Sequence, residues 1–187
     1  MLTHVGQILP NCGIPTMFRG VMYRSRLEAK WAAVFDAIKW PTVYEQCDLN
    51  GYIPDFIAEF GESDLLIEIK PDLSPEALAT AKQKIERSGW EGEALILSGR
   101  TEFCAVQPRI GDFAEYVDGP DGKQHVWSDG FMFRCLNCGL MFACGGDSWR
   151  CRRCGAFDGN AHIGDVGNDF EAAWLDAGNR VQWKAAG

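Results

Sequence analysis

The sequence predicts an α/β protein in which a mixed sheet is flanked by helices and carries a small cysteine-rich module. The first observation is that two amphipathic helical segments alternate with four short apolar segments, in the order α-β-β-β-α-β. The second is that charged side chains interrupt an apolar hairpin between the two helical segments. The third is a pair of Cys-x-x-Cys motifs in the last third of the chain.

The size and charge of the chain limit its function. Its 187 residues are enough for one moderate domain, or for a domain and a small module. We find no signal-peptide pattern and no apolar run long enough to cross a membrane, so the expected location is the cytoplasm of the producing or host cell. The net charge of -8 argues against a general affinity for nucleic acid, so any such contact requires a local basic patch.

The first regular element is expected to be a helix. Residues 1–20 contain several breakers and are expected to be irregular. The helix is expected to begin after Ser25, a suitable N-cap, and to end before Pro41, because apolar residues recur between them at helical spacing. Glu28 lies three residues after Ser25 and fits a capping box. Alternatively, its carboxylate faces the acidic residues of the next elements, and both interpretations can hold in part.

Three strands are expected next. Residues 42–45 are β-prone, and residues 47–51 form a turn. Residues 53–60 and 65–69 are expected to form a hairpin that turns at Gly61-Glu62. A two-residue loop with glycine first suits a type II′ turn, so the pattern also predicts the register of the hairpin.

The charged residues of this hairpin are the main functional clue. The predicted register places Asp55 opposite Glu68, and Lys70 lies on the same face as Glu68 because side chains alternate along a strand. Three ionisable groups thus meet on an otherwise apolar hairpin. Buried charges are costly unless they are paired or bind a metal, so the group is either a cross-strand salt bridge or a binding site.

The elements after the hairpin follow from turn and cap signals. A capped helix start at residues 74–76 predicts a second helix, which is followed by a buried strand at residues 93–98. Residues 101–106 are expected to form a further strand. Residues 108–130 are rich in Gly, Asp and Pro and are expected to be a connection that holds a small hairpin around residues 118–122.

Two copies of a Cys-x-x-Cys-Gly motif indicate a metal centre. A gap of two residues lets a tight turn present both sulfurs to one ion, and the glycine permits the dihedral angles of that turn. The pattern predicts one structural, tetrahedral zinc ion, with an iron–sulfur cluster as the alternative and with Cys144 or His162 as possible replacements for one ligand. The expected ligands are Cys135, Cys138, Cys151 and Cys154.

The cysteine module is the most basic part of the chain and is rich in aromatic residues. These features allow it to hold nucleic acid by charge and stacking, with Arg150, Arg152 and Arg153 as contacts. They equally fit a stabilising cap on the main domain, because aromatic side chains in such ribbons usually pack in the interior. A short helix at residues 169–177 is expected to pack back on the protein through Trp174.

The chain therefore divides into four expected regions, and we find no internal repeat or low-complexity segment. The regions are a core at residues 1–107, a connecting segment at 108–130, a zinc ribbon at 131–158 and a C-terminal tail at 159–187 that packs on the core.

The core residues resemble the PD-(D/E)xK nuclease superfamily. The resemblance is carried by Glu28 on the first helix, Pro54-Asp55 on one strand and Glu68-Ile69-Lys70 on the next. The α-β-β-β-α-β order agrees with this superfamily, and the resemblance covers about residues 15–98. The acidic net charge and the lack of an obvious basic channel depart from the family pattern.

A wider similarity supports the same superfamily. Residues 22–32, Tyr44-Glu45 and residues 53–56 are similar to a set of small phage and mobile-element proteins. The chain is also similar to the transposon end-cleaving endonucleases and the archaeal Holliday-junction resolvases of this superfamily. Some members of the superfamily have lost catalysis, so the fold does not by itself imply activity.

The resemblance implies a restriction-endonuclease-like core and a metal-dependent endonuclease that hydrolyses DNA phosphodiester bonds. Asp55 and Glu68, with the backbone carbonyl of Ile69, would hold Mg²⁺ or Mn²⁺. Glu28 would bind the ion directly or through water. Lys70 would orient the attacking water or stabilise the transition state.

Other functions remain open at this point. Arg24, Arg26 and Lys84 are the candidate DNA contacts of the core, and a solvated surface explains each of them equally well. A non-catalytic module would bind nucleic acid or a protein with the same fold and the ribbon. A third alternative is a subunit of a recombination or anti-defence assembly whose nuclease works only in the complex. The expected partners are DNA and a further protein or a second copy of the chain, as a homodimer.

Overall fold

The first half of the molecule has the order of elements that the sequence predicts. The computed structural model describes residues 13–61, 63–102, 107–146, 149–157, 159 and 161–182. The predicted series is formed by α1 (Arg26–Ile38), β3 (Thr42–Tyr44), β4 (Phe56–Glu59), β5 (Asp64–Lys70), α2 (Pro75–Arg87) and β6 (Glu93–Glu102). The order of helices and strands in this half is therefore confirmed.

Two short strands precede α1, and five elements follow β6. They are β1 (Thr16–Phe18), β2 (Val21–Tyr23), β7 (Arg109–Gly119), β8 (Gly122–Cys135), β9 (Met141–Cys144), β10 (Ile163–Gly164) and α3 (Asp169–Arg180). Strand β1 lies within residues 1–20, where the sequence predicts irregular chain, and it forms a hairpin with β2; strands of three residues are too short to show an alternating pattern. The expected helix at residues 169–177 is α3. Of the expected strand at residues 101–106, the first two residues extend β6 and the other four lie outside the described residues.

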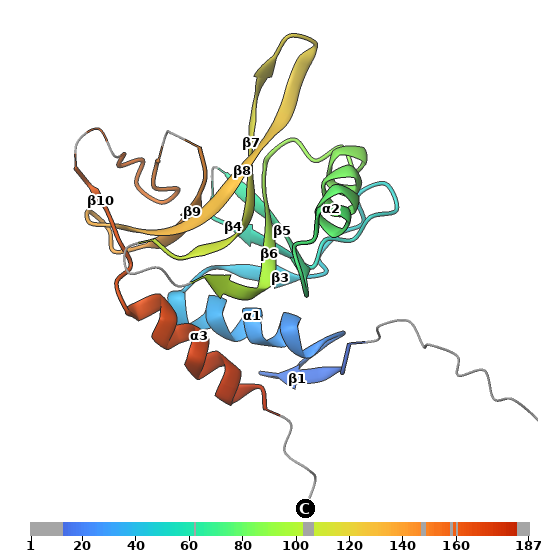
Figure 1. Ribbon diagram of the computed structural model, residues 1–187, viewed down its shortest axis with the longest axis vertical. Coiled ribbons are helices and arrows are strands. Elements are labelled where there is room, and N and C mark those ends of the chain that lie inside the picture. Colours follow the sequence, from blue (N-terminus) through green and yellow to red (C-terminus); the bar gives the residue numbers. More distant parts are fainter. Residues whose placement is uncertain are drawn as a thin grey trace, which may run out of the picture.

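A curled mixed sheet runs through the molecule (Figure 1). Its strand order is β10-β8-β7-β6-β5-β4-β3, and β9 pairs with β8 beside this path. The pair β5–β6 is parallel, whereas β4–β5 and β6–β7 are antiparallel. The sheet is therefore mixed, as the alternation of helices and strands predicts.

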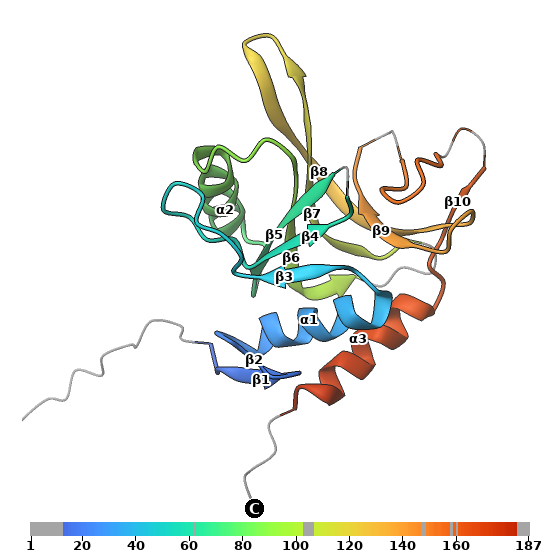
Figure 2. The same cartoon turned by 180° about the vertical axis from the view of Figure 1, so that it is seen from behind.

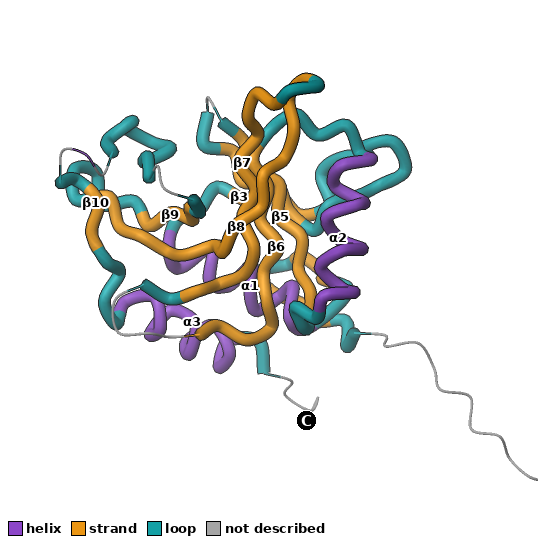
Figure 3. The backbone as a smooth tube through the Cα atoms, turned by 45° about the horizontal axis from the view of Figure 1, so that its top comes forward, coloured by secondary structure: helices purple, strands orange, loops and turns teal. Residues whose placement is uncertain are grey.

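Helices cover both faces of the sheet. Figure 2 shows α1, α3 and the β1–β2 hairpin on one face, and Figure 3 shows α2 on the other. Each face has its own apolar core, and successive residues of β5 alternate between them: Leu65 and Ile67 face α1, whereas Leu66 faces α2. Trp174 of α3 packs against Trp31 of α1, with ring centroids 4.8 Å apart. None of the described helices is long and apolar enough to cross a membrane.

The two helices of the core begin at the predicted caps. The Ser25 hydroxyl accepts a hydrogen bond from the backbone N–H of Glu28 at 3.1 Å, and Ser74 caps α2 in the same way. Helix α1 ends at Ile38, and its C-cap residue Lys39 has a left-handed φ of 62° two residues before Pro41. These caps fix where the two helices begin relative to the edge of the sheet.

The β4–β5 hairpin has the predicted register. Phe56 pairs with Ile67 and Glu59 pairs with Asp64, so Asp55 and Glu68 are the next residues along the two strands. Glu62 of the predicted type II′ turn lies outside the described residues. Because the register holds up to Phe56, Asp55 and Glu68 lie at the same end of the hairpin, away from its turn.

The predicted connection at residues 108–130 is wrong. This segment forms β7 and most of β8, a long hairpin that belongs to the main sheet and extends past its edge (Figure 1). Gly111 lies inside β7 because a Cβ atom there would overlap the backbone oxygen of Ile96 on β6. Asp112 is buried, and its carboxylate forms ion pairs with Lys82 and Arg109. The glycine here permits two strands to approach closely, and the aspartate forms buried ion pairs, so neither residue indicates a loop. Only the hairpin around residues 118–122 is as predicted.

Candidate functional site

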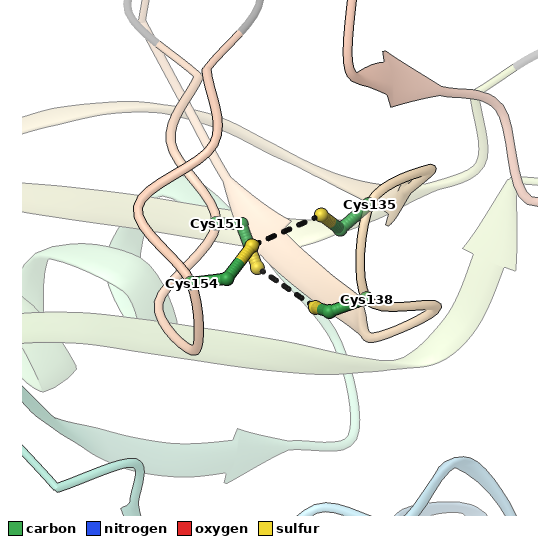
Figure 4. A group of neighbouring side chains, drawn as sticks. All are labelled: Cys135, Cys138, Cys151 and Cys154. Atoms are coloured by element: carbon green, nitrogen blue, oxygen red, sulfur yellow. Dashed lines mark hydrogen bonds between the residues drawn. The ribbon is translucent and has the colours of Figure 1, made fainter.

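Four cysteines form a compact cluster at the end of β8 (Figure 4). Their sulfur atoms all lie within 4.8 Å of one another, and the pairs Cys135–Cys154 and Cys138–Cys151 are each 3.5 Å apart. Zinc–sulfur bonds of about 2.3 Å in a tetrahedron place the sulfurs about 3.8 Å apart, so the cluster has the size that one ion requires. The four predicted ligands can therefore hold one structural metal ion such as zinc. Cys144 and His162 lie outside this group.

The backbone around the cysteines explains the geometry of the cluster. In the first motif the N–H of Gly139 donates to the carbonyl of Cys135 at 2.8 Å, and in the second the N–H of Gly155 donates to the carbonyl of Cys151 at 2.9 Å. Both glycines have positive φ, 74° and 70°. The two motifs thus fold into the same tight turn, for the reason that the sequence indicates.

The two cysteines of the second motif differ in their chemical state when no metal is bound. Burial raises the pKa of Cys151 to about 12, whereas the side-chain amide of Asn137 and the backbone N–H of Ala156 lower the pKa of Cys154 to about 6. Metals bind the thiolate form. Metal binding must therefore displace the proton of Cys151, while Cys154 is already ionised at neutral pH.

The arginines of the second cysteine motif do not form one surface patch. The guanidinium of Arg152 is only 6% exposed, pairs with Glu93 of β6 and lies 5.3 Å from the ring centre of Phe113. Burial lowers the pKa of Arg152 to about 10. Arg152 was expected to contact nucleic acid, but in the structure its side chain connects the second cysteine motif to β6 through Glu93. Arg150 and Arg153 are exposed, as the prediction requires.

The acidic residues of the hairpin lie in a pocket of about 510 Å³, which we call the acidic pocket. It lies where β5 ends and α1 begins. Its walls are Arg24, Glu28, Gly51, Tyr52, Ile53, Asp55, Glu68, Ile69, Lys70 and Lys84. The structure thus brings Glu28, Asp55, Glu68 and Lys70, which were chosen from the sequence, into one pocket.

Asp55 is a nearly buried carboxylate of the pocket. Its side chain accepts a hydrogen bond from Nη2 of Arg24 at 2.8 Å and another from the backbone N–H of Ile69 at 2.7 Å. Only 5% of the residue is exposed. Burial, together with the charge of Glu68, raises the pKa of Asp55 to about 7. The charged form of Asp55 is therefore only partly compensated by its two donors.

Glu68 and Lys70 lie next to Asp55 on the same face of the sheet. The ammonium of Lys70 forms an ion pair with Oε1 of Glu68, and the hydroxyl of Tyr52 donates to Oε2 at 2.7 Å. Burial and the charge of Glu68 raise the pKa of Tyr52, so its hydroxyl stays a donor. Both oxygens of Glu68 are thus held by side chains of the pocket.

Glu28 approaches the pocket from α1, on the opposite face of the sheet. Its Oε1 accepts from the Ser25 hydroxyl at 2.7 Å, so it takes part in the helix cap. Its Oε2 accepts from the Tyr44 hydroxyl at 2.5 Å and from the backbone N–H of Arg24 at 3.2 Å. The capping interpretation and the pocket interpretation of Glu28 are thus both correct in part.

The three carboxylates are not gathered closely enough to form a ready metal cage. Among the described residues, the four cysteines are the one group of three or more Cys, His, Asp and Glu side chains with ligand atoms that meet around a common point. In the acidic pocket, Arg24 pairs with Asp55, and Lys70 pairs with Glu68. An ion at Asp55 and Glu68 would have to displace these two cations.

The remaining predicted contacts have clear positions. Arg24 is 60% exposed and reaches Asp55, Glu28 and Glu45, so it belongs to the pocket itself. Lys84 is an exposed residue of α2 and lines the pocket. Arg26 is exposed at the first residue of α1.

Two tyrosines of the site were not found from the sequence. Tyr44 and Tyr52 each donate to a carboxylate of the pocket. Tyr44 lies on β3, but Tyr52 lies in the turn before β4, where no periodic pattern indicates which way a side chain points. The structure brings the N–H of Ile69 to Asp55, and a metal-binding role for the Ile69 carbonyl stays a prediction.

Comparison of the chain with protein-family models, with curated proteins and with solved structures finds no match.

Proposed function

We propose that the chain is a metal-dependent nuclease that hydrolyses DNA phosphodiester bonds in the acidic pocket. The proposal rests on one observation: Asp55, which directly precedes β4, meets Glu68 and Lys70 of the neighbouring strand β5 in a pocket where the Asp55 carboxylate is poorly compensated. Perturbed carboxylates beside a lysine in a cleft are typical of functional sites. We also propose a restriction-endonuclease-like core of the PD-(D/E)xK superfamily, which the order of elements and the hairpin register support.

The donor set of the pocket fits a hard divalent cation. Mg²⁺ and Mn²⁺ prefer carboxylate and water oxygens, and Asp55 and Glu68 offer two nearly buried carboxylates. Glu28 would take part directly or through water. When bound, the ion would supply an acidified water and positive charge beside the phosphate.

The other side chains of the pocket have roles that follow from their contacts. Tyr52 holds one oxygen of Glu68 and so fixes the direction of its carboxylate. Lys70 can move its ammonium from Glu68 to the attacking water or to a phosphate oxygen, where negative charge develops. Arg24 is largely exposed and can pass from Asp55 to a phosphate, since guanidinium groups bind phosphate oxygens well.

A non-catalytic binding module is the second candidate. The observation that favours it is that each carboxylate already has a cationic partner: Arg24 pairs with Asp55, and Lys70 pairs with Glu68. DNA or a protein partner would then bind elsewhere, for example at the exposed Arg150 and Arg153. A nuclease that needs a protein partner or a second copy of the chain lies between the two candidates.

A substrate panel separates these candidates. The purified protein is incubated with duplex, single-stranded and branched DNA and with RNA, in Mg²⁺, in Mn²⁺ and in EDTA. We expect metal-dependent DNA cleavage that Lys70→Ala abolishes, whereas Lys123→Ala, which removes an exposed lysine of β8, leaves it intact. Binding of DNA without cleavage under every condition would favour the second candidate.

A further inference from the structure

A second pocket adjoins the acidic pocket, and we call it the side pocket. It has a volume of about 420 Å³ and shares Arg24, Glu28 and Ile69 with the acidic pocket. Its other walls are Gly13, Ile14, Ser25, Arg26, Leu27 and Pro71. Three residues line both volumes, so the side pocket lies directly beside the acidic pocket.

The walls of the side pocket combine apolar surface with positive charge. Ile14 is 56% exposed, Leu27 is half-buried and Pro71 is exposed, so apolar surface is open to a ligand. Arg24 and Arg26 are exposed residues beside it, and the guanidinium of Arg24 pairs with Asp55 and Glu45. A flat, weakly polar ring joined to an anion matches this combination, because the ring can stack on apolar side chains or guanidinium planes while the arginines pair with the anion.

The size of the side pocket agrees with one such ring and its sugar. Pockets for small ligands have volumes of about 300–1,000 Å³. A base that is paired inside a duplex is stacked on both sides, and it can enter a pocket only by leaving the stack, which costs a few kcal/mol. An unpaired base avoids most of that cost.

We infer that the side pocket binds one unpaired nucleobase next to the phosphate that lies in the acidic pocket. This inference rests on the proposed function and specifies its substrate class: DNA with an unpaired nucleotide at the point of cleavage. Single strands, bulges and branch points belong to this class, whereas a perfect duplex does not.

The test is a binding experiment that does not require hydrolysis. An oligonucleotide duplex with a single bulged 2-aminopurine is titrated with the protein in Ca²⁺, and the same duplex with the 2-aminopurine paired serves as the reference. The wild type is expected to bind the bulged duplex about tenfold more tightly than the paired duplex, a difference of about 1.4 kcal/mol in binding free energy. Binding of the bulged duplex is also expected to change the fluorescence of the 2-aminopurine. Ile14→Asp, which puts a negative charge on an exposed wall, is expected to abolish both effects.

Two further variants keep the test decisive. Met17→Asp is the matched control, because Met17 is 62% exposed on the β1–β2 hairpin and lines neither pocket. Arg26→Glu changes a different exposed wall and is expected to act in the same direction as Ile14→Asp. Equal binding of the bulged and paired forms by the wild type overturns the inference, as does equal behaviour of Ile14→Asp and Met17→Asp.

Cleavage of the same oligonucleotides in Mg²⁺ separates the inference from the proposed function. Cleavage of bulged and perfect duplexes alike, without the 2-aminopurine signal, overturns the inference and leaves the nuclease standing. A preference for the bulged form without cleavage supports the pocket and overturns the nuclease.

Discussion

Replacement of Asp55 by asparagine tests whether the acidic pocket is a cation site or a salt bridge. Asparagine has almost the same shape as aspartate but carries no charge. If the burial of the Asp55 carboxylate is unfavourable unless a metal ion is bound, the variant is more stable than the metal-free wild type at neutral pH. If Asp55 mainly makes a stabilising pair with Arg24, the variant is less stable.

The magnitude follows from the raised pKa. The ordinary pKa of aspartate is 3.8, and the folded protein raises that of Asp55 to about 7. At about 1.4 kcal/mol per pH unit, this difference of about 3 units corresponds to at most about 4 kcal/mol. Water in the open pocket and movement of the exposed Arg24 side chain screen part of it, so we expect the variant to be more stable by about 2 kcal/mol at pH 8.

The sign of the pH dependence is fixed by the same values. Folded Asp55 holds its proton more strongly than unfolded Asp55, so the stability of the metal-free wild type falls as the pH rises from about 4 to about 7 and then stays level. The variant lacks this loss. The two proteins should therefore have similar stability at pH 4 and diverge toward pH 8.

The assay is thermal unfolding in EDTA across this pH range. A gain of about 2 kcal/mol raises the unfolding temperature by about 6 °C in a chain of this size. Mg²⁺ at ten times its dissociation constant should stabilise the wild type by about 1.4 kcal/mol and leave the variant unchanged. Asp112→Asn is the matched control, because Asp112 is buried between Lys82 and Arg109 and should lose stability on substitution. A loss of stability in Asp55→Asn at pH 8, as in this control, would show instead that Asp55 makes a stabilising pair with Arg24.

Three further predictions concern other parts of the molecule. Arg24→Gln should lower the Mg²⁺ dissociation constant about fivefold at pH 8.5 in calorimetry, because the ion no longer displaces a guanidinium from Asp55, and an unchanged constant would show that Arg24 does not compete. Metal analysis should find one zinc ion per chain, and a finding of iron would contradict this. Cys138→Ala should lose the zinc, and its free energy of unfolding in denaturant should fall by at least about 3 kcal/mol, whereas a metal-free protein of unchanged stability would contradict a structural role for the metal. Gly111→Ala should cost about 3 kcal/mol in the same assay, because its Cβ would overlap the Ile96 carbonyl oxygen, and a neutral effect would show that β6 and β7 can separate.

The parts of the fold that depend on local signals could be predicted from the sequence. Ser25 and Ser74 cap their helices as expected, and the β4–β5 register followed from a short hairpin. The β7–β8 hairpin could not be predicted. Only glycine fits at position 111 because the backbone of β6 lies against it, and β6 contacts it from about 15 residues earlier in the sequence. Composition alone cannot distinguish a glycine that permits close strand approach from one that permits a turn.

The candidate site shows the same division. The cysteine cluster was predictable because each motif folds into its turn locally. Asp55 and Glu68 were predictable because they follow paired strand positions. The Arg24 contact to Asp55 and the burial of Arg152 were not, because both depend on elements far apart in the sequence that meet only after folding.

Hydrolysis of phosphodiester bonds in the acidic pocket is proposed to depend on Lys70. The most direct measurement is the single-turnover rate of DNA cleavage in Mg²⁺ by the wild type, by Lys70→Ala and by Lys123→Ala. We expect cleavage that stops in EDTA, that falls at least about 100-fold in Lys70→Ala and that is unchanged in Lys123→Ala. Equal rates for the three proteins, or no cleavage by any of them, would contradict it.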